Sequence, residues 1–186
     1  MDLDKALKER HSARSFFDKK PDWRDIIKAI DAANLAPLAG NIPALRFILV
    51  DDTDKINQLA EASQQDFVAE AYYVVAIVSD PNLVEKSYGE RAEKYLPQQA
   101  GAAIENFLLK ITELGLSSCW VGAFVDEQVK RILQIPDSAE VEAILPVGYE
   151  KVPKSKQRKK SNLDPILFFN IWKNKYMKPL KKPESV

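Results

Sequence analysis

The sequence predicts a layered domain of mixed α and β structure. Its 186 residues are 46% hydrophobic and 29% charged, which is typical of one soluble globular domain, or of one domain with an appendage. About four short apolar stretches of strand length alternate with segments of helical periodicity, and one of those helices is apolar enough to be buried. The apolar run 74–78 is far too short to cross a bilayer, which argues against a membrane-spanning chain.

Helices and strands alternate along the first half of the chain. We expect helices over 2–10, 22–35 and 53–62, and strands over 46–50 and 73–79. The second helix has apolar residues at the spacing of one helix face, namely Trp23, Ile26, Ile27, Ile30 and Ala33. It should end near Pro37, because the residue before a proline disfavours helical angles. Residues 37–45 are then a loop.

The second half contains the strongest helix signal. We expect a partly helical stretch over 81–95, helices over 97–114 and 126–133, and strands over 118–125 and 141–149. The helix over 97–114 has a long apolar stripe and ends at Gly115, a natural C-cap. Small residues crowd its start at 100–103. They allow either the close approach of a flat ligand or tight packing in the core.

Charge divides the chain near residue 150. Residues 1–150 hold 16 basic and 25 acidic residues, and residues 151–186 hold 11 basic and 2 acidic ones, so net charges of −9 and +9 cancel. We therefore expect a body over 1–150 and a basic extension over 151–186. The extension could bind nucleic acid, a membrane surface or a phosphorylated ligand, or wrap an acidic body. Its apolar patch, 166–172, needs a surface to cover it, on this chain or on a second copy.

Several kinds of chemistry lack their residues. With one cysteine, Cys119, and one histidine, His11, the chain can form neither a Cys/His zinc site nor an internal disulfide. The phosphate-binding glycine motifs of P-loop and Rossmann proteins are absent from the sequence. The N-terminus has no apolar signal core, so we expect a cytoplasmic protein. A bound organic cofactor is the expected carrier of any reaction.

The segment Arg10-His11-Ser12-Ala13-Arg14 is the first candidate site. In an extended chain Arg10, Ser12 and Arg14 point to the same side. Two guanidinium groups beside a hydroxyl suit a phosphate monoester, which arginine binds through two parallel hydrogen bonds. Solvated surface charge is the competing interpretation of the same residues.

From this segment onward the sequence resembles the FMN-dependent nitroreductase superfamily. The similarity continues in order through five segments, namely 9–16, 36–47 (APLAGNIPALRF), 100–109, 114–122 (LGLSSCWVG) and 145–149 (LPVGY). These span about three quarters of the chain. The resemblance implies an α+β fold with a central, mostly antiparallel sheet flanked by helices. It also implies a homodimer with an extended C-terminal segment and with FMN sites at the subunit interface.

The resemblance also implies the cofactor-binding residues. Arg10, His11, Ser12 and Arg14 match positions that hold the FMN phosphate and part of its ring. Asn41 matches a loop asparagine that contacts the flavin, and Val121 and Gly122 match the strand end beside its reactive nitrogen. Among the basic residues after 150, Arg158 and Lys160 are expected to close on the phosphate. No metal and no catalytic side chain are expected, because the flavin performs the hydride chemistry.

The implied activity is hydride transfer by a ping-pong reaction. NADH or NADPH would reduce FMN, and a nitroaromatic, a quinone or a similar small acceptor would then oxidise it; no nucleic acid or membrane partner is expected. Leu38 and the run 43–45 depart from the usual loop, which leaves their flavin contacts open. The alternatives are a dehalogenating or flavin-processing member of the superfamily, and a non-catalytic binding protein with a basic tail. The stretch 80–97 is short for the lid that dehalogenating members would need.

Overall fold

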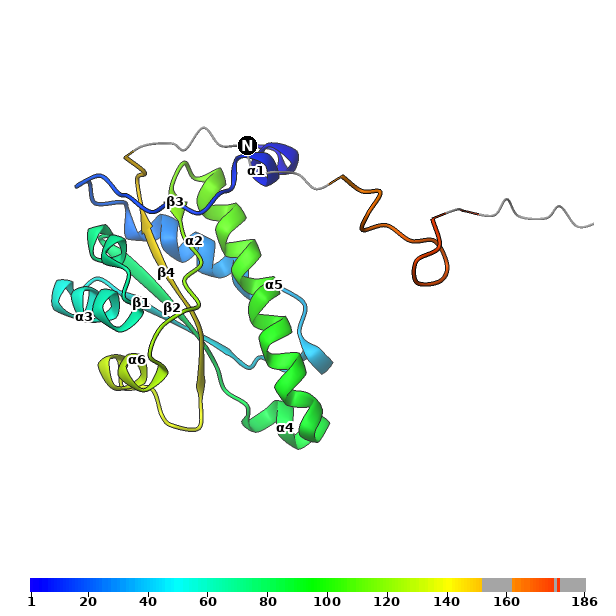
Figure 1. Ribbon diagram of the computed structural model, residues 1–186. Coiled ribbons are helices and arrows are strands. Elements are labelled where there is room, and N and C mark those ends of the chain that lie inside the picture. Colours follow the sequence, from blue (N-terminus) through cyan, green and yellow to red (C-terminus); the bar gives the residue numbers. More distant parts are fainter. Residues whose placement is uncertain (152–161, 176, 178–186) are drawn as a thin grey trace, which may run out of the picture.

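The computed structural model describes residues 1–151, 162–175 and 177 (Figure 1). Its helices are α1 (Leu3–Glu9), α2 (Trp23–Asn34), α3 (Thr53–Ser63), α4 (Asn82–Tyr88), α5 (Ala92–Glu113) and α6 (Asp126–Leu133). Its strands are β1 (Leu45–Val50), β2 (Tyr73–Ser79), β3 (Ser117–Ser118) and β4 (Glu140–Gly148). Short 3₁₀ turns are η1 (Ala39–Asn41), η2 (Asp66–Glu70) and η3 (Gly89–Arg91). The expected α+β fold class is confirmed.

The described strands form one antiparallel sheet in the order β1-β2-β4-β3, covered by helices on both faces (Figure 1). Successive side chains of a strand point to opposite faces, so β2 contributes to two separate cores. Tyr73, Val75 and Ile77 pack in the core with α2 and α5. The alternate residues Val74, Ala76 and Val78 pack in the core with α3 and α6. All seven residues of β2 are buried, as expected for a strand in the middle layer.

Helix α5 begins five residues before the predicted start at Pro97. Proline favours the first turn of a helix, which made residue 97 the natural start. Instead Ala92 and Leu96 are buried in a small core with Val84 of α4 and Ala44. This packing extends the helix through the proline, at the expense of one backbone hydrogen bond.

The strand predicted over 118–125 is wrong beyond Ser118. Ser118 pairs with Val147 of β4, and the backbone meets β4 again in an isolated bridge between Val121 and Ile144. Along this register Cys119 lies opposite Pro146, which has no N–H to donate. The proline therefore interrupts the ladder, and residues 122–125 leave the sheet.

The extended segment 10–17 lies along the end of β4 and fixes the N-terminal part of the chain. The Phe17 N–H donates to the Tyr149 carbonyl at 2.7 Å, and the Lys151 N–H donates to the Ser15 carbonyl at 3.2 Å. Phe16 is 1% exposed and lies directly over Gly148. A β-carbon at Gly148 would lie 2.9 Å from Cδ1 of the Phe16 ring. Glycine is therefore required for this close approach.

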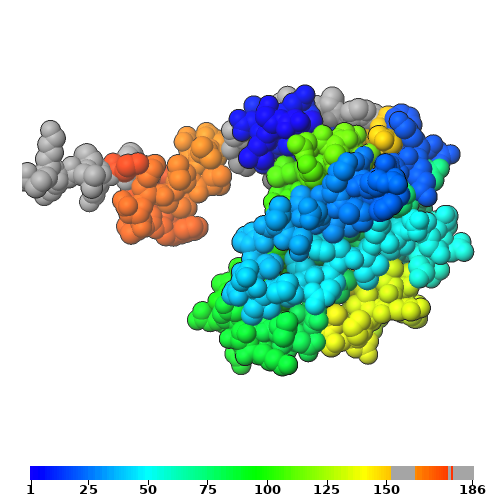
Figure 2. All heavy atoms as spheres, turned by 180° about the vertical axis from the view of Figure 1, so that it is seen from behind, coloured from blue at the N-terminus to red at the C-terminus, as the bar shows by residue number. Residues whose placement is uncertain are grey.

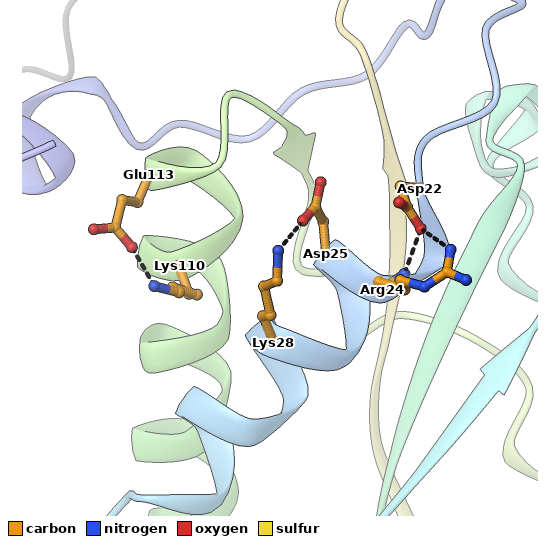
Figure 3. A network of polar contacts seen from close by, with 6 residues as sticks. All are labelled: Asp22, Arg24, Asp25, Lys28, Lys110 and Glu113. Carbon is orange, nitrogen blue, oxygen red and sulfur yellow. Dashed lines mark hydrogen bonds and ion pairs between the residues drawn. The ribbon is translucent and has the colours of Figure 1, made fainter.

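The ion pairs drawn on α2 and α5 in Figure 3 each stay within one helix, whereas the Asn106 amide of α5 donates to the Ala32 carbonyl of α2 at 3.3 Å. Asp22 caps α2 by accepting the Arg24 N–H at 2.9 Å, which lowers the pKa of Asp22 below its ordinary value. Lys28 pairs with Asp25 at 2.7 Å on α2, and Lys110 with Glu113 at 2.5 Å on α5. Ion pairs of this kind, close to solvent, contribute little to the free energy of unfolding. The apolar core between the two helices holds them together.

The C-terminal segment 162–175 stands apart from the body (Figures 1 and 2). The Phe168 and Trp172 rings lie 4.8 Å apart, and the Lys175 ammonium lies 4.1 Å from the Phe168 ring centroid. Trp172 is nevertheless 77% exposed. The described part of the tail is therefore not covered by its own body. The sequence had allowed either this chain or a second copy to cover it. In the described part of the chain, no helix is long and apolar enough to cross a membrane.

We predict that Gly148→Ala destabilises the protein by about 1–3 kcal/mol, the usual effect of overpacking a core. Phe16 would have to move, because its ring lies inside contact distance of the added methyl group. Urea unfolding followed by circular dichroism measures the change. Gly101→Ala is the matched control, since its β-carbon would meet Trp120 at 3.8 Å and alanine favours a helix. Equal stability of the two variants would contradict the close-approach argument.

Candidate functional site

Two of the predicted motifs meet at the edge of the sheet. Ser12 forms a parallel bridge with Ser118 of β3, and the Ala13 N–H donates to the Ser118 carbonyl at 3.0 Å. The segment 10–14 thus lies beside 117–122, although more than one hundred residues separate them in the sequence. The backbone contact confirms that these two segments are neighbours.

The two arginines of this segment differ in their surroundings. Arg10 lies mostly covered, with its Nε 3.3 Å from the Glu105 Oε1 on α5. Arg14 is exposed, and it has no ion pair with any residue that the structure describes. Glu105 therefore orients Arg10, whereas the Arg14 charge is free to meet an anion.

His11 is held at both ring nitrogens. Its Nδ1 lies 2.8 Å from the Glu9 carbonyl oxygen, and its Nε2 lies 2.6 Å from Oε2 of Glu150. The backbone hydrogen bond to Glu9 raises the pKa of His11 above 6.5, with a smaller contribution from Glu150, while partial burial opposes the rise. The imidazole therefore anchors the segment to the end of β4.

Val121 and Gly122 have different hydrogen-bonding roles. The Val121 N–H donates to the Ile144 carbonyl at 3.1 Å, and the Ile144 N–H donates back at 3.0 Å. The Gly122 N–H makes no such bond to another described residue. Gly122 is exposed, and a β-carbon there would meet only the Trp120 indole, at 3.8 Å. Backbone at Gly122 is thus open to a ligand, while backbone at Val121 belongs to the sheet.

Asn41 lies away from this cluster within the chain. Its neighbour Gly40 contacts Tyr88, whose ring lies 5.2 Å from Tyr95 near the start of α5. Arg10 instead contacts Glu105, ten residues further along the helix, which corresponds to about 15 Å at 1.5 Å per residue. One chain therefore does not bring Asn41 to the arginines. Arg158 and Lys160 lie outside the described residues.

Three residues belong to this region without having been predicted. Glu105 and Glu150 hold Arg10 and His11, and the Ser118 hydroxyl is buried with no hydrogen-bond partner among the described residues. Glu105 and Ser118 lie within the segments that carry the resemblance. No local pattern marks Glu150, because its partner is 139 residues away. A buried hydroxyl without a hydrogen-bond partner calls for an explanation, and a ligand that supplies the missing bond is one.

This geometry defines a class of protein: a layered α+β domain with a cationic segment, 10–14, at one edge of its sheet. The family model that matches the chain is described as the Nitroreductase family, and it matches residues 7–65 and 57–149. The chain belongs to the Nitroreductase family.

The names of similar proteins state more than one activity. A relative from Archaeoglobus fulgidus is 31% identical over 155 residues, 81% of this chain and 86% of that protein; its name proposes an NADH dehydrogenase or NAD(P)H nitroreductase. An iodotyrosine deiodinase from Thermotoga neapolitana is 28% identical over 165 residues, 80% of this chain and 89% of its own. The solved structure of an FMN-dependent nitroreductase from Clostridium difficile R20291 has a TM-score of 0.77 and 26% identity, covering 90% of this chain and 98% of its own.

We predict that Cys119 does not react with iodoacetamide in the folded protein. The thiol is 1% exposed, and burial raises its pKa, although the Arg14 charge and a hydrogen bond with the Ser12 hydroxyl oppose the rise. As the chain has one cysteine, mass spectrometry of the intact protein gives an unambiguous result. Labelling in urea provides the positive control. Rapid native labelling would show that the thiol is a reactive group.

Proposed function

We propose that this protein is an FMN-dependent oxidoreductase that passes hydride from NADH or NADPH to a small electron acceptor such as a nitroaromatic or a quinone. The observation that carries this proposal is the contact between segment 10–14 and β3, which sets the unpaired Arg14 charge at the edge of the sheet. Family membership and the FMN-dependent relative support the same cofactor.

The residues at the sheet edge fit the phosphate of FMN. Arg14 has no competing carboxylate among the described residues, and the Ser118 hydroxyl lacks a partner. Arg10 and Ser12 complete a set of cationic and hydroxyl donors of the kind that binds phosphate. We propose that these residues hold the phosphate, and that Arg158 and Lys160 close over it from the extension 151–186.

We propose that Gly122 and Trp120 receive the flat ring of the cofactor. The backbone at Gly122 is open, and the 41% exposed Trp120 indole lies beside it. When bound, FMN supplies the hydride chemistry. The protein residues then bind and orient the flavin, so no side chain is required as a nucleophile or a general base.

The proposed site needs a second subunit. Asn41 would complete it only from a partner chain, because about 15 Å of α5 separates it from Arg10 in its own chain. A groove of about 320 Å³ between α1, α2 and α5 is bordered by exposed apolar residues, including Leu3 and Leu35. We propose a homodimer that covers this face, with the body over 1–150 and the extension reaching the partner.

A reductive dehalogenase is the second candidate, because the deiodinase relative aligns over most of this chain. The region between β2 and α5 contains the seven-residue helix α4 and the turn η3. This leaves little chain for a lid over a bound amino acid. Turnover of an iodotyrosine, with none of a nitroaromatic, would favour this alternative.

Absorption spectroscopy of the purified protein tests the proposal. We expect a yellow protein that releases one FMN per chain on denaturation and is bleached by NADH or NADPH without oxygen. A nitroaromatic or a quinone should restore the colour. Protein that stays colourless after incubation with FMN contradicts the function, and binding of FAD instead of FMN contradicts the phosphate assignment.

We predict that Arg14→Ala weakens FMN binding by about 10- to 100-fold, since a hydrogen bond to a charged group contributes about 1.5–3 kcal/mol. The side chain is exposed, so the fold should remain intact. Quenching of FMN fluorescence by apoprotein measures the affinity, and Arg24→Ala, another exposed arginine, is the control. Unchanged affinity would remove Arg14 from the site.

We predict that deleting residues 163–186 moves the protein from dimer toward monomer or aggregate and releases flavin. The segment exposes apolar residues that its own body does not cover, including Ile166, Ile171 and Trp172. Light scattering and the flavin absorbance of the same sample measure both effects. A truncated chain that remains dimeric and yellow would show that the helices of the body suffice.

A further inference from the structure

The hydrogen bonds of His11 determine its charge. The Glu9 carbonyl oxygen at Nδ1 can only accept a hydrogen bond, and the ionised Glu150 carboxylate at Nε2 can also only accept one. Each ring nitrogen must therefore carry a hydrogen, which describes the imidazolium form. The contact at 2.6 Å is consequently a charged pair.

The pair lies in partly buried surroundings, where an unpaired charge is destabilising. The Glu150 side chain is 6% exposed, and that of His11 is 35% exposed. Arg10, the neighbouring cation, is paired with Glu105 of α5. Lys151, which follows Glu150 in the chain, pairs with Glu70 at 2.9 Å. These nearby charges are thus already matched, which leaves His11 as the counter-ion of Glu150.

We propose that the His11–Glu150 pair is a clamp that holds segment 10–14 in its phosphate-binding position, and that its protonation sets the affinity for FMN. The inference rests on the proposed function. His11 is a positioning residue: both of its N–H groups bind the protein itself. Loss of its proton would break one of the two contacts and leave a buried carboxylate unpaired beside a site for a dianion.

The direction of the pH effect follows from the geometry. The pKa of His11 is raised in the folded protein, so the clamp is complete below about pH 6.5, the ordinary value, and is lost as the pH rises through the folded value. FMN affinity should fall over the same interval, by about 3- to 10-fold for one partly screened charge.

Nuclear magnetic resonance tests the pair without any cofactor. His11 is the only histidine, so one imidazole signal reports its titration in the apoprotein. We expect a midpoint above 6.5 in the wild type and a lower midpoint in Glu150→Gln. Glu113→Gln is the control, because it removes a carboxylate that pairs with Lys110 and not with His11. A wild-type midpoint below 6.5, or no shift in Glu150→Gln, overturns the clamp.

Titration of FMN into the apoproteins from pH 6 to 9 tests the functional link. We expect the wild-type dissociation constant to rise with increasing pH, and the rise should be centred on the midpoint of the His11 titration. For His11→Gln only the second ionisation of the FMN phosphate, with a pKa of about 6, should change the dissociation constant, and it strengthens binding as the pH rises. The glutamine amide can still donate to Glu150 but does not titrate. A dissociation constant that still rises with pH in His11→Gln overturns the link. Absence of FMN binding at every pH would instead refute the proposed function, and with it the link to FMN affinity. The titration of His11 in the apoprotein tests the His11–Glu150 pair independently of FMN.

Discussion

The close approach of Phe16 to Gly148 is the constraint on which the candidate site depends. With no β-carbon at Gly148, segment 10–17 can lie against the end of β4 and donate and accept backbone hydrogen bonds there. The same placement brings Ser12 to Ser118 at the sheet edge. A basic motif that would otherwise be a solvated N-terminal stretch thereby becomes one wall of a site.

Acidic residues of the body organise this basic segment. Glu105 pairs with Arg10, Glu150 pairs with His11, and Glu70 accepts the Phe16 N–H at 3.0 Å. That last hydrogen bond is the main reason why the pKa of Glu70 lies below its ordinary value. The net charge of −9 over residues 1–150 therefore includes carboxylates that position cations. Arg14 is exposed and forms no ion pair with any residue that the structure describes, which is why we propose it as a ligand of the phosphate.

The length of α5 separates the two halves of the candidate site within one chain. Its N-terminal end is near the loop that contains Asn41, and Glu105, ten residues beyond Tyr95, meets Arg10. A rigid helix does not shorten to bring them together. In the homodimer that we propose, a second copy of the chain would bridge that separation and cover the exposed apolar residues of α1 and α2.

The sequence by itself determined the elements whose signals are local. Periodicity located α2, β2 and α6 to within a residue, and the motif at 10–14 and the segment at 114–122 marked both walls of the candidate site. Tertiary structure alone decided where β3 ends, since Pro146 lies opposite Cys119 only in the folded register. It also moved the start of α5 to Ala92, before Pro97, and it made Glu150 the partner of His11. Those outcomes depend on contacts between distant residues, which no local pattern of side chains encodes.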